Sequence, residues 1–308
     1  MTFRLSRSML VGALGFGFAI SASAGLPPNI WLEGGSNYLG HVQGVCTDGT
    51  NLWWSMTFDL VRTDLSGRIL ERYSDLSEHM GDLCVHGGRL YVGVNRKAKA
   101  GARRGDQVWV FDSKSLRRQK VVETPQTIWC NNGIEWSDDR FWIITNAPVF
   151  SEYNYVYEFL EDFRFVQCRP IASGWTNLGV QTICRWGEKM LLGCYGTAKG
   201  VPGEHENAIL VVDRRELTRP SGNNFETPSI VPIEARVRKS GGGGMLFLDG
   251  YLWIGRCVTR KLPEGEWKTH PNGLVERARF GAFISRERDF EKCYDKALNE
   301  WKERGSKK

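Results

Sequence analysis

Short apolar runs separated by polar turns follow one another along the chain, and one such unit is repeated. The run His41 to Cys46, followed by Leu52-Trp53-Trp54, returns as His79 to Cys84, followed by Leu90-Tyr91-Val92. Three weaker copies begin at Asn132, Gln181 and Gly243. The copies lie about 40 to 60 residues apart, close to the period of β-propeller blades. The pattern therefore predicts a repeat protein.

Each copy predicts an apolar strand, a turn with Gly or Asp, a second apolar strand, a loop and a third strand. Short strands with regular turns are typical of an all-β array. The predicted third strands are 60–64, 108–112, 156–159, 209–213 and 280–284. A fourth, outer strand follows most of them, at 68–73, 119–123, 163–169 and 229–235. After the fifth copy the apolar residues change to helical spacing. The fifth copy therefore has no outer strand after it. We expect the segment 29–32, which precedes the first copy, to supply this strand.

We therefore predict an all-β fold, a β-propeller of five blades with six as the alternative. Its ring is expected to be closed by the N-terminal strand, which removes exposed sheet edges. A short C-terminal helix should follow the last blade. The expected organisation is a signal peptide at 1–24, a single propeller domain at 25–286, and a C-terminal helix and tail at 287–308.

The first residues have the features of a secretory signal peptide. Arg4 and Arg7 precede the apolar run from Met9 to Ile20, and small residues follow up to Ala24. We expect cleavage after Ala24 and a secreted or periplasmic mature protein. No later stretch reaches the roughly 20 apolar residues of a transmembrane helix, so no membrane span is expected.

Charge and motifs exclude several partners. The full chain holds 41 basic and 35 acidic side chains, which are interspersed, so nothing points to a nucleic acid. The sequence has no phosphate loop or dinucleotide fingerprint, and no nucleotide cofactor is expected. It also lacks the Gly-x-Ser-x-Gly elbow of serine hydrolases.

The eight cysteines all follow the signal peptide, so up to four disulfides are possible in an oxidising compartment. Cys46, Cys84 and Cys184 occupy the same position in three copies. We interpret these three as small buried apolar residues. The cysteines that are freer to pair are Cys130, Cys168, Cys194, Cys257 and Cys293.

The longest connections all fall between second and third strands, at 96–106, 147–155, 196–207 and 258–277. In a propeller these loops open on the same face as the loops that lead into the first strands. We name this the mouth face and its opposite the plain face. Elaborated loops on one face of a rigid scaffold are typical of a binding site.

Polar residues stand at the start of the first strands, where apolar ones would be expected. They are His41 with Gln43, His79 with Asp82, Asn131 with Asn132, and Gln181 with Thr182. One interpretation is structural: such side chains could satisfy backbone groups beside the central channel. The other is functional: two histidines at equivalent positions of adjacent blades would converge on a polar ligand or a metal.

The ends of the second strands reach the same face. They carry Thr57, Asn95, Asn146, Tyr195 and Arg256. Amides combined with Tyr, Arg and His suit a sugar-like ligand, whose hydroxyls need polar partners and whose ring faces favour aromatic stacking. The predicted substrate-binding residues are Gln43, Asn95, Asn131, Asn132, Asn146, Gln181 and Arg256.

The predicted catalytic residues are His41, His79, Asp82 and Tyr195. A glycosidase would need two carboxyl groups about 5 to 10 Å apart, and Asp82 is the only carboxylate with a clear position in the ring. A polysaccharide lyase would instead need a base such as His or Tyr and a group that neutralises a uronate. The set resembles the lyase requirement more closely.

One segment carries a family resemblance. Asn132-Gly133-Ile134-Glu135-Trp136-Ser137-Asp138-Asp139 is similar to the Asn-Gly-apolar-x-Trp-Ser-x-Asp segment of the propellers related to senescence marker protein 30, gluconolactonase and strictosidine synthase, within the NHL- and TolB-like group. The resemblance implies a divalent metal (Ca, Mg, Mn or Zn) that polarises a lactone or ester carbonyl, with Asn132 as one ligand. Where the family has a Glu and an Asp, this chain has Gln43 and a glycine, so the implied site is incomplete.

Three hypotheses follow. The first is a secreted carbohydrate-active lyase or hydrolase that uses the His41 and His79 ring, with a divalent metal bound by His41, His79 and Asn132 as an option. The second is a noncatalytic propeller that binds a glycan or a protein on the same face. The third is a metal-dependent lactonase or esterase with a remodelled site.

Overall fold

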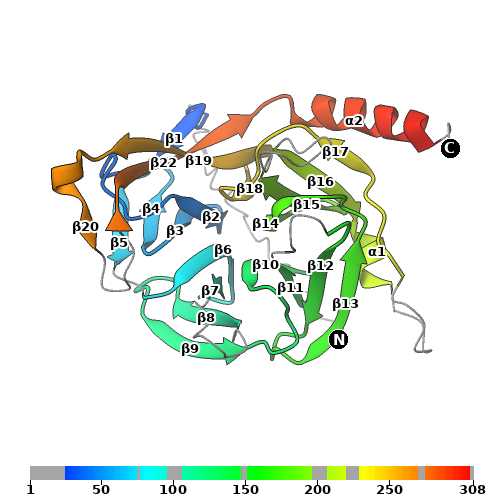
Figure 1. The fold of residues 1–308 in the computed structure, drawn as a ribbon, viewed down its shortest axis with the longest axis horizontal. Helices are drawn as coiled ribbons and strands as arrows, with labels where there is room; N and C mark the ends of the chain where they lie inside the picture. Colours follow the sequence, from blue (N-terminus) through cyan, green and yellow to red (C-terminus); the bar gives the residue numbers. More distant parts are fainter. Residues whose placement is uncertain are drawn as a thin grey trace, which may run out of the picture.

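Five four-stranded antiparallel sheets stand around a central axis in the computed structural model of the chain (Figure 1). The structure describes residues 25–74, 77–95, 106–145, 147, 151–195, 207–219, 229–269 and 275–305. The predicted β-propeller of five blades is confirmed, and the six-bladed alternative is wrong. The predicted signal peptide at 1–24 lies outside the described residues.

The blades are numbered in chain order, and their strands are given from the channel outward. Blade 1 contains β2 (Val42–Thr47), β3 (Asn51–Met56), β4 (Leu60–Asp64) and β5 (Ile69–Tyr73). Blade 2 contains β6 (His79–His86), β7 (Arg89–Asn95), β8 (Gln107–Asp112) and β9 (Arg118–Glu123). Blade 3 contains β10 (Asn131–Ser137), β11 (Arg140–Thr145), β12 (Asn154–Phe159) and β13 (Phe165–Ile171). Blade 4 contains β14 (Asn177–Trp186), β15 (Lys189–Tyr195), β16 (Ala208–Asp213) and β17 (Ala235–Val237). Blade 5 contains β18 (Met245–Leu248), β19 (Tyr251–Lys261), β22 (Ala278–Glu287) and β1 (Asn29–Trp31).

The ring is closed by the N-terminal strand, as predicted. β1 pairs antiparallel with β22, with Asn29 opposite Ser285 and Trp31 opposite Phe283. The rings of Trp31 and Phe283 stack with their centroids 4.3 Å apart. Blade 5 is thus made from both ends of the propeller, and this pairing joins residues that are far apart in the chain. Without β1, the long strand β22 would expose its backbone donors and acceptors.

Large aromatic residues of the second strands fill the space between blades. Trp54, Trp142 and Trp253 are fully buried. Each indole N–H donates a hydrogen bond, to Thr63 Oγ1 at 3.1 Å, to the Ser137 carbonyl at 3.1 Å and to the Leu248 carbonyl at 3.0 Å, respectively. Burial of a Trp with its N–H satisfied contributes apolar contact without the cost of an orphaned donor.

The inner strands of four blades share an irregularity near the mouth face. The strand pairing shifts between Val42 and Gly44, Met80 and Leu83, Asn131 and Gly133, and Val180 and Thr182. Such a β-bulge inserts an extra residue and changes the direction of its side chain. The residues inserted are Gln43 in blade 1, Gly81 with Asp82 in blade 2, Asn132 in blade 3 and Gln181 in blade 4. The bulges explain why polar side chains at these positions lie at the channel.

The remaining elements lie at the outside of the ring. They are α1 (Arg214–Thr218), η1 (Glu264–Glu266), the hairpin β20 (Lys268–Thr269) with β21 (Val275–Glu276), and α2 (Phe290–Gly305). The segment expected to be a loop at 258–277 is in part a ribbon, because β19 continues to Lys261 beside β22. The predicted C-terminal helix is α2, which lies along the outer edge of blade 4 (Figure 1). Its apolar residues Phe290 and Tyr294 contact Trp186, with ring centroids 5.2 and 5.1 Å apart.

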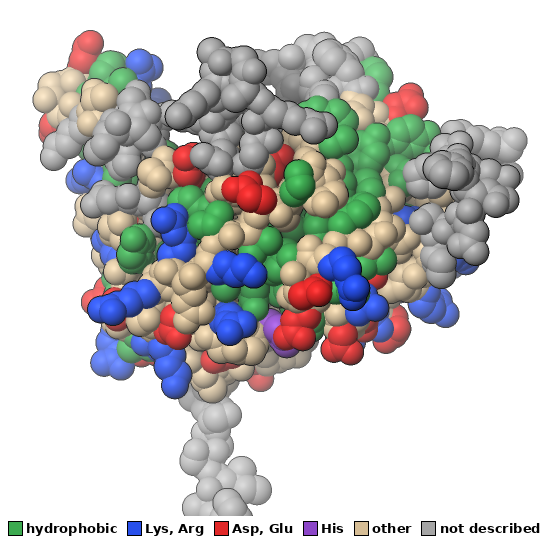
Figure 2. All heavy atoms as spheres, turned by 90° about the horizontal axis from the view of Figure 1, so that it is seen from below, with side chains coloured by type: hydrophobic (Ala, Val, Ile, Leu, Met, Phe, Trp, Pro, Cys, Tyr) green, Lys and Arg blue, Asp and Glu red, His purple; other side chains and the backbone are tan. Residues whose placement is uncertain are grey.

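The outer wall of the ring mixes charges with exposed apolar side chains (Figure 2). Val121 of β9 is 40% exposed, and Val166 of β13 is 43% exposed. Lys120 and Arg164 lie beside them in the sequence. Charged residues on edge strands oppose edge-to-edge pairing with other chains.

All eight cysteines lie in the described part of the chain, and none of them is in a disulfide bond. Cys84 and Cys184 are buried and Cys46 is half-buried, in accord with their interpretation as small packed residues. No helix in the described ranges is both long enough and apolar enough to cross a bilayer.

Candidate functional site

A chain of hydrogen bonds joins blades 1 and 4 at the mouth face. His41 Nε2 lies 3.0 Å from Tyr195 Oη and 3.0 Å from Gln43 Nε2. The Gln43 amide also donates to Thr57 Oγ1 at 3.2 Å. His41 precedes β2, whereas Tyr195 ends β15, so 154 residues separate the two partners in the chain. The predicted catalytic residues His41 and Tyr195 therefore come together, and Gln43 contacts the same imidazole nitrogen.

Burial keeps His41 and Tyr195 neutral at physiological pH. Burial lowers the pKa of His41 below its usual value. Burial raises the pKa of Tyr195 to about 12, and Cys257 nearby adds to the shift. At neutral pH the imidazole is thus an unprotonated acceptor and the phenol retains its proton. A neutral His beside a protonated Tyr can act as a base and an acid, respectively.

His79 lies at the start of β6 and is half-buried. Burial lowers its pKa, and the charge of protonated His41 acts in the same direction, so that the pKa is about 4. His79 and His41 are close enough to interact electrostatically, and His79 is neutral at physiological pH.

Asp82 has a different environment from the histidines. It is 1% exposed, and its Oδ2 accepts a hydrogen bond from the backbone N–H of Ile183 in blade 4 at 3.1 Å. Burial raises its pKa well above the usual value, while the backbone N–H groups of Leu83 and Val45 act in the opposite direction. The side chain thus contacts blades 1, 2 and 4 across the axis of the ring.

Glycine makes room for Asp82. A Cβ at Gly44 would overlap Asp82 Oδ1, and a Cβ at Gly133 would lie 3.0 Å from Asp82 Cβ. Glycine at these equivalent inner-strand positions of blades 1 and 3 therefore leaves room for the carboxylate. Asp82 is buried and bonds to the backbone of blade 4, while its Oδ1 has no hydrogen-bond partner among the described residues.

The two asparagines of blade 3 also bond to the backbone of the propeller. Asn131 is fully buried, and its amide donates to the Gln107 carbonyl at 3.0 Å and to Thr124 Oγ1 at 2.8 Å. Asn132 Nδ2 donates to the Val180 carbonyl at 2.9 Å, and its Oδ1 accepts from Cys130 Sγ at 3.3 Å. Both side chains link neighbouring strands and blades.

Two more of the predicted binding residues, Gln181 and Asn95, are half-buried, and a third is not described. Gln181 is half-buried at the bulge of β14 and donates to the carbonyl of Leu178. Asn95 ends β7 opposite His79 and is half-buried. Asn146 lies outside the described residues.

Arg256 points away from the site. Its guanidinium donates to Ser285 Oγ at 2.7 Å and pairs with Glu287 at 2.8 Å. Glu287 also binds Lys239 at 2.6 Å. The hairpin register explains the difference, because the residue of β19 that matches Thr57 and Tyr195 is Cys257, one position later. Cys257 is exposed.

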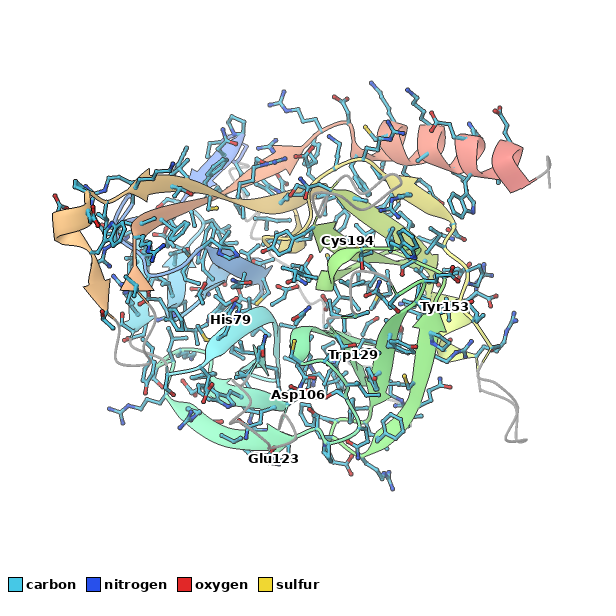
Figure 3. The ribbon with its side chains drawn as sticks, in the orientation of Figure 1. His79, Asp106, Glu123, Trp129, Tyr153 and Cys194 are labelled. Carbon is cyan, nitrogen blue, oxygen red and sulfur yellow. The ribbon has the colours of Figure 1, made fainter. Side chains whose placement is uncertain are left out.

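Two residues at the mouth of blade 3 were not predicted from the sequence. Trp129 and Cys130 have φ values of 65° and 73°, which are left-handed and unusual for residues other than glycine. The turn is held by the backbone N–H of Cys130, which donates to Asp106 Oδ2 at 2.9 Å. Figure 3 labels Asp106 and Trp129. Trp129 is half-buried, and its ring centroid lies 5.6 Å from that of Tyr155. Strained backbone of this kind is concentrated at functional sites.

On the plain-face side of Asp82, the next inner-strand level carries titratable groups. Burial raises the pKa of Glu135 to about 8, against the backbone N–H groups of Trp136 and Arg185 and the charge of Arg185. Burial also raises the pKa values of Cys46, Cys84 and Cys184, and the charges of Asp82 and Glu135 add to this effect. Thiols in such surroundings stay protonated and are poor nucleophiles.

The metal expected from the family resemblance has no matching set of ligands in the described residues. They contain no group of three His, Cys, Asp or Glu side chains that could hold a metal ion. Asn132 Oδ1 accepts from a thiol and His41 Nε2 is engaged by Tyr195 and Gln43, so the two would have to rearrange to bind an ion. The residues present do not fit the implied metal as they are arranged.

No family model matches the chain, and no curated protein matches it in sequence. Solved structures are similar in fold. The Bacteroides ovatus xyloglucan PUL GH43B aligns over 84% of this chain and 54% of its own, with 13% identity and a TM-score of 0.55, so this chain spans about half the length of that protein. The WD40 domain of Neurospora crassa Pan2 covers 79% of this chain and 75% of its own, at 9% identity and a TM-score of 0.41.

The PQQ-bound aldose sugar dehydrogenase of Streptomyces coelicolor covers 85% of this chain and 100% of its own, at 9% identity and a TM-score of 0.43. At such identities the likeness is one of fold alone. The similarity to the lactonase group, which rests on the segment from Asn132, is not confirmed and stays a prediction.

Proposed function

We propose that the mouth of this propeller binds a carbohydrate and acts on it by general acid–base chemistry. The observation that carries the proposal is the contact of 3.0 Å between His41 Nε2 and Tyr195 Oη. Both groups are neutral near pH 7, since the pKa of His41 is lowered and that of Tyr195 is raised to about 12. General acid–base catalysis contributes about 10²- to 10⁴-fold to a rate.

Elimination on a uronate-containing chain is the reaction that suits this pair best. Once a substrate displaces Tyr195 and Gln43 from Nε2, His41 would take the proton from the ring carbon next to the uronate carboxylate. The bond between the neighbouring ring carbon and the glycosidic oxygen would break, and a carbon–carbon double bond would form. Tyr195 would donate its proton to the departing oxygen. A glycosidase would need two carboxylates about 5 to 10 Å apart, and Asp82 is engaged by backbone amides of three blades.

A noncatalytic propeller that binds a glycan is the second candidate. The observation in its favour is that Asp82, Asn131 and Asn132 bond to the propeller itself. Fewer side chains of the ring are then left for a substrate. In this alternative His41 and Tyr195 would contribute hydrogen bonds to sugar hydroxyls and no chemistry.

The proposal includes export, because the predicted signal peptide would direct the mature chain to the cell exterior or the periplasm, where polysaccharides are met. A lactonase with a remodelled metal site remains a prediction. Metal analysis of the purified protein would test it, since a bound divalent ion in stoichiometric amount would favour that reaction class.

The experiment is an activity screen with two matched variants. The mature chain is incubated with uronate-containing and neutral polysaccharides, and the ultraviolet absorbance of unsaturated products and the release of reducing ends are followed. His41→Ala should lower the rate about 100-fold or more, since it removes the base. His86→Ala is the control, because His86 lies at the plain-face end of β6 and stacks on Trp136 with ring centroids 3.9 Å apart.

Unsaturated products that depend on His41 and not on His86 would support the lyase. Reducing ends without absorbance would indicate a hydrolase instead. Binding of a polysaccharide with no turnover, weakened by His41→Ala, would establish the noncatalytic alternative. No binding of any glycan would contradict the carbohydrate proposal.

A further inference from the structure

The first strand of blade 4 departs from the repeat beside Tyr195. In β14, Asn177 pairs with Tyr195, but the next paired residue is Val180, so Leu178 and Gly179 are left out of the pairing. A second shift follows in β14, whereas β2, β6 and β10 have one shift each. Those blades close without the extra bulge, so the fold itself does not require it.

Leu178 has a left-handed backbone, with a φ of 58°. This conformation is sterically unfavourable for a residue with a side chain and is typical of glycine. The side chain is nevertheless 52% exposed, so it gains little from packing within the blade. An apolar residue that is both strained and exposed contributes little to the stability of the fold. Backbone outliers of this kind are concentrated at functional sites.

Two amide side chains hold this bulge in place. Gln181 donates to the Leu178 carbonyl, and Asn132 Nδ2 of blade 3 lies 3.5 Å from the same oxygen. Asn132 also donates to the Val180 carbonyl at 2.9 Å, just beyond the bulge. These two amides, which were predicted to bind a substrate, thus fix the position of Leu178.

Leu178 lies on the channel side of blade 4, because β14 is the innermost strand of the sheet. Tyr195, at the end of β15, meets His41, and blades 1 and 4 are not neighbours in the ring. Their contact is therefore made across the channel mouth. Leu178 follows directly after Asn177, the partner of Tyr195. Chain and pairing distances place the Cα atoms of Leu178 and Tyr195 within about 9 Å of each other. A sugar residue joined to the oxygen that Tyr195 protonates is thus within reach of the Leu178 side chain.

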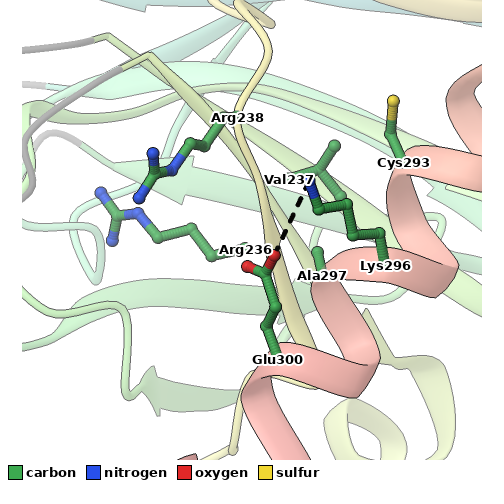
Figure 4. A pocket seen from close by; sticks show the side chains of 7 residues that line it. All are labelled: Arg236, Val237, Arg238, Cys293, Lys296, Ala297 and Glu300. Atoms are coloured by element: carbon green, nitrogen blue, oxygen red, sulfur yellow. Dashed lines mark ion pairs between the residues drawn. The ribbon is translucent and has the colours of Figure 1, made fainter.

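The pocket at the outer rim of blade 4 is a less suitable place for that sugar. It has a volume of about 440 Å³ and lies between β17 and α2. Figure 4 shows that the side chains of Arg236 and Arg238 extend away from α2, while Lys296 of α2 lies 4.0 Å from Glu300. The strand β16 stands between this pocket and the strand that carries Tyr195.

We propose that Leu178 is a specificity-determining contact for the sugar residue that carries the departing oxygen. The inference rests on the proposed function and adds a requirement to its substrate: the sugar on the departing side presents a ring face made of C–H groups. An aliphatic side chain can cover such a face without leaving a polar group unpaired. A hydroxyl or carboxylate placed against it would lose water and gain no hydrogen bond. Leu178 acts on binding and not on proton transfer.

The test uses two uronate substrates that differ only in the group on the departing oxygen, a sugar residue in one and a methyl group in the other. Leu178→Gly should raise KM about tenfold on the first, since a side chain that is 52% exposed can still bury about half of its apolar area. Its kcat should stay within about twofold, because the contact is equal in the ground state and the transition state. On the methyl substrate both constants should match the wild type. Leu178→Met, which keeps an apolar side chain, should keep the KM of the wild type on both substrates.

Thermal melts separate this role from a structural one. Glycine adopts the left-handed conformation freely, so Leu178→Gly should melt at the temperature of the wild type or higher. Asp249→Gly is the matched control, because Asp249 has a φ of 52° in the exposed turn between β18 and β19 on the plain face. This control should relieve the same backbone strain and leave KM unchanged.

An unchanged KM of Leu178→Gly for the sugar-bearing substrate would overturn the inference, and so would an equal rise on both substrates. A lower melting temperature with losses on both substrates would show that Leu178 is structural. If His41→Ala abolishes turnover while Leu178→Gly changes nothing, the proposed function stands and only this contact fails. If no glycan binds the wild type, both fail.

Discussion

Blades 1 and 4 use their polar mouth residues differently from blades 2 and 3. In blades 1 and 4, His41, Gln43 and Tyr195 bond to one another through their side chains. In blades 2 and 3, Asp82, Asn131 and Asn132 bond to backbone groups of their own or neighbouring blades. The bulged positions in the strands are equivalent, yet their side chains have different partners, and His79 of blade 2 remains a half-buried, neutral group at the mouth.

The comparison shows that a polar ring is not by itself a site. A side chain that satisfies buried N–H and C=O groups stabilises the ring and loses its freedom to act. A His and a Tyr that share one hydrogen bond keep opposite proton affinities and can transfer protons.

The largest expected effect is that of Asp82 on the free energy of unfolding. Asp82→Ala should lower the free energy of unfolding by about 3 kcal/mol, because buried backbone donors lose their acceptor and each such loss costs about 1 to 3 kcal/mol. Asp82→Asn should cost less than half as much, since one acceptor oxygen remains. Urea unfolding of both variants measures this. A stable Asp82→Ala protein without activity would show that Asp82 takes part in catalysis and not in stability.

The second largest expected effect is that of the Tyr195 hydroxyl on turnover. Tyr195→Phe should lower turnover about 100-fold on the substrate that the screen identifies, because the general acid is removed while the ring is kept. The free energy of unfolding should change little. Steady-state kinetics together with thermal melts measure the two effects. A large loss of stability with unchanged turnover would place Tyr195 among the structural residues.

The pH profile should have a limb on the acid side only. His41 must be neutral to accept a proton, and its pKa is lowered, so kcat/KM should stay constant through neutral pH and fall about tenfold per unit only below the pKa of this residue. Tyr195 must keep its proton, and its pKa of about 12 postpones any alkaline limb. An alkaline limb near pH 8 that Tyr195→Phe removes would contradict the assignment.

The last prediction concerns the pH dependence of stability through Glu135, on the plain-face side of Asp82. Its pKa is raised from 4.5 to about 8, so the folded state holds the proton more tightly than the unfolded state. Its contribution to stability is therefore full below about pH 4.5 and is lost as the pH rises toward 8. Glu135→Gln should flatten the dependence of the melting temperature on pH over this window. An unchanged slope would show that other groups cause it.

Much of the fold could be predicted from the repeat. Apolar runs such as Leu52-Trp53-Trp54 gave the second strands, and the unpaired segment near Asn29 indicated how the ring closes. The bulges could not be predicted, because an extra residue opposite Gly93 is visible only when both strands are paired. Asn131 shows the consequence: it starts a strand like its neighbours, but its side chain points between blades.

A ring of β blades with polar residues at one face could be predicted from the sequence, since period and alternation follow from local backbone geometry. Which of these residues meet depends on the tertiary structure. His41 and Tyr195 are 154 residues apart and are joined by ring closure. Arg256 pairs with Glu287, whereas its neighbour Cys257 holds the position equivalent to Thr57 and Tyr195, because successive side chains of a strand point to opposite faces.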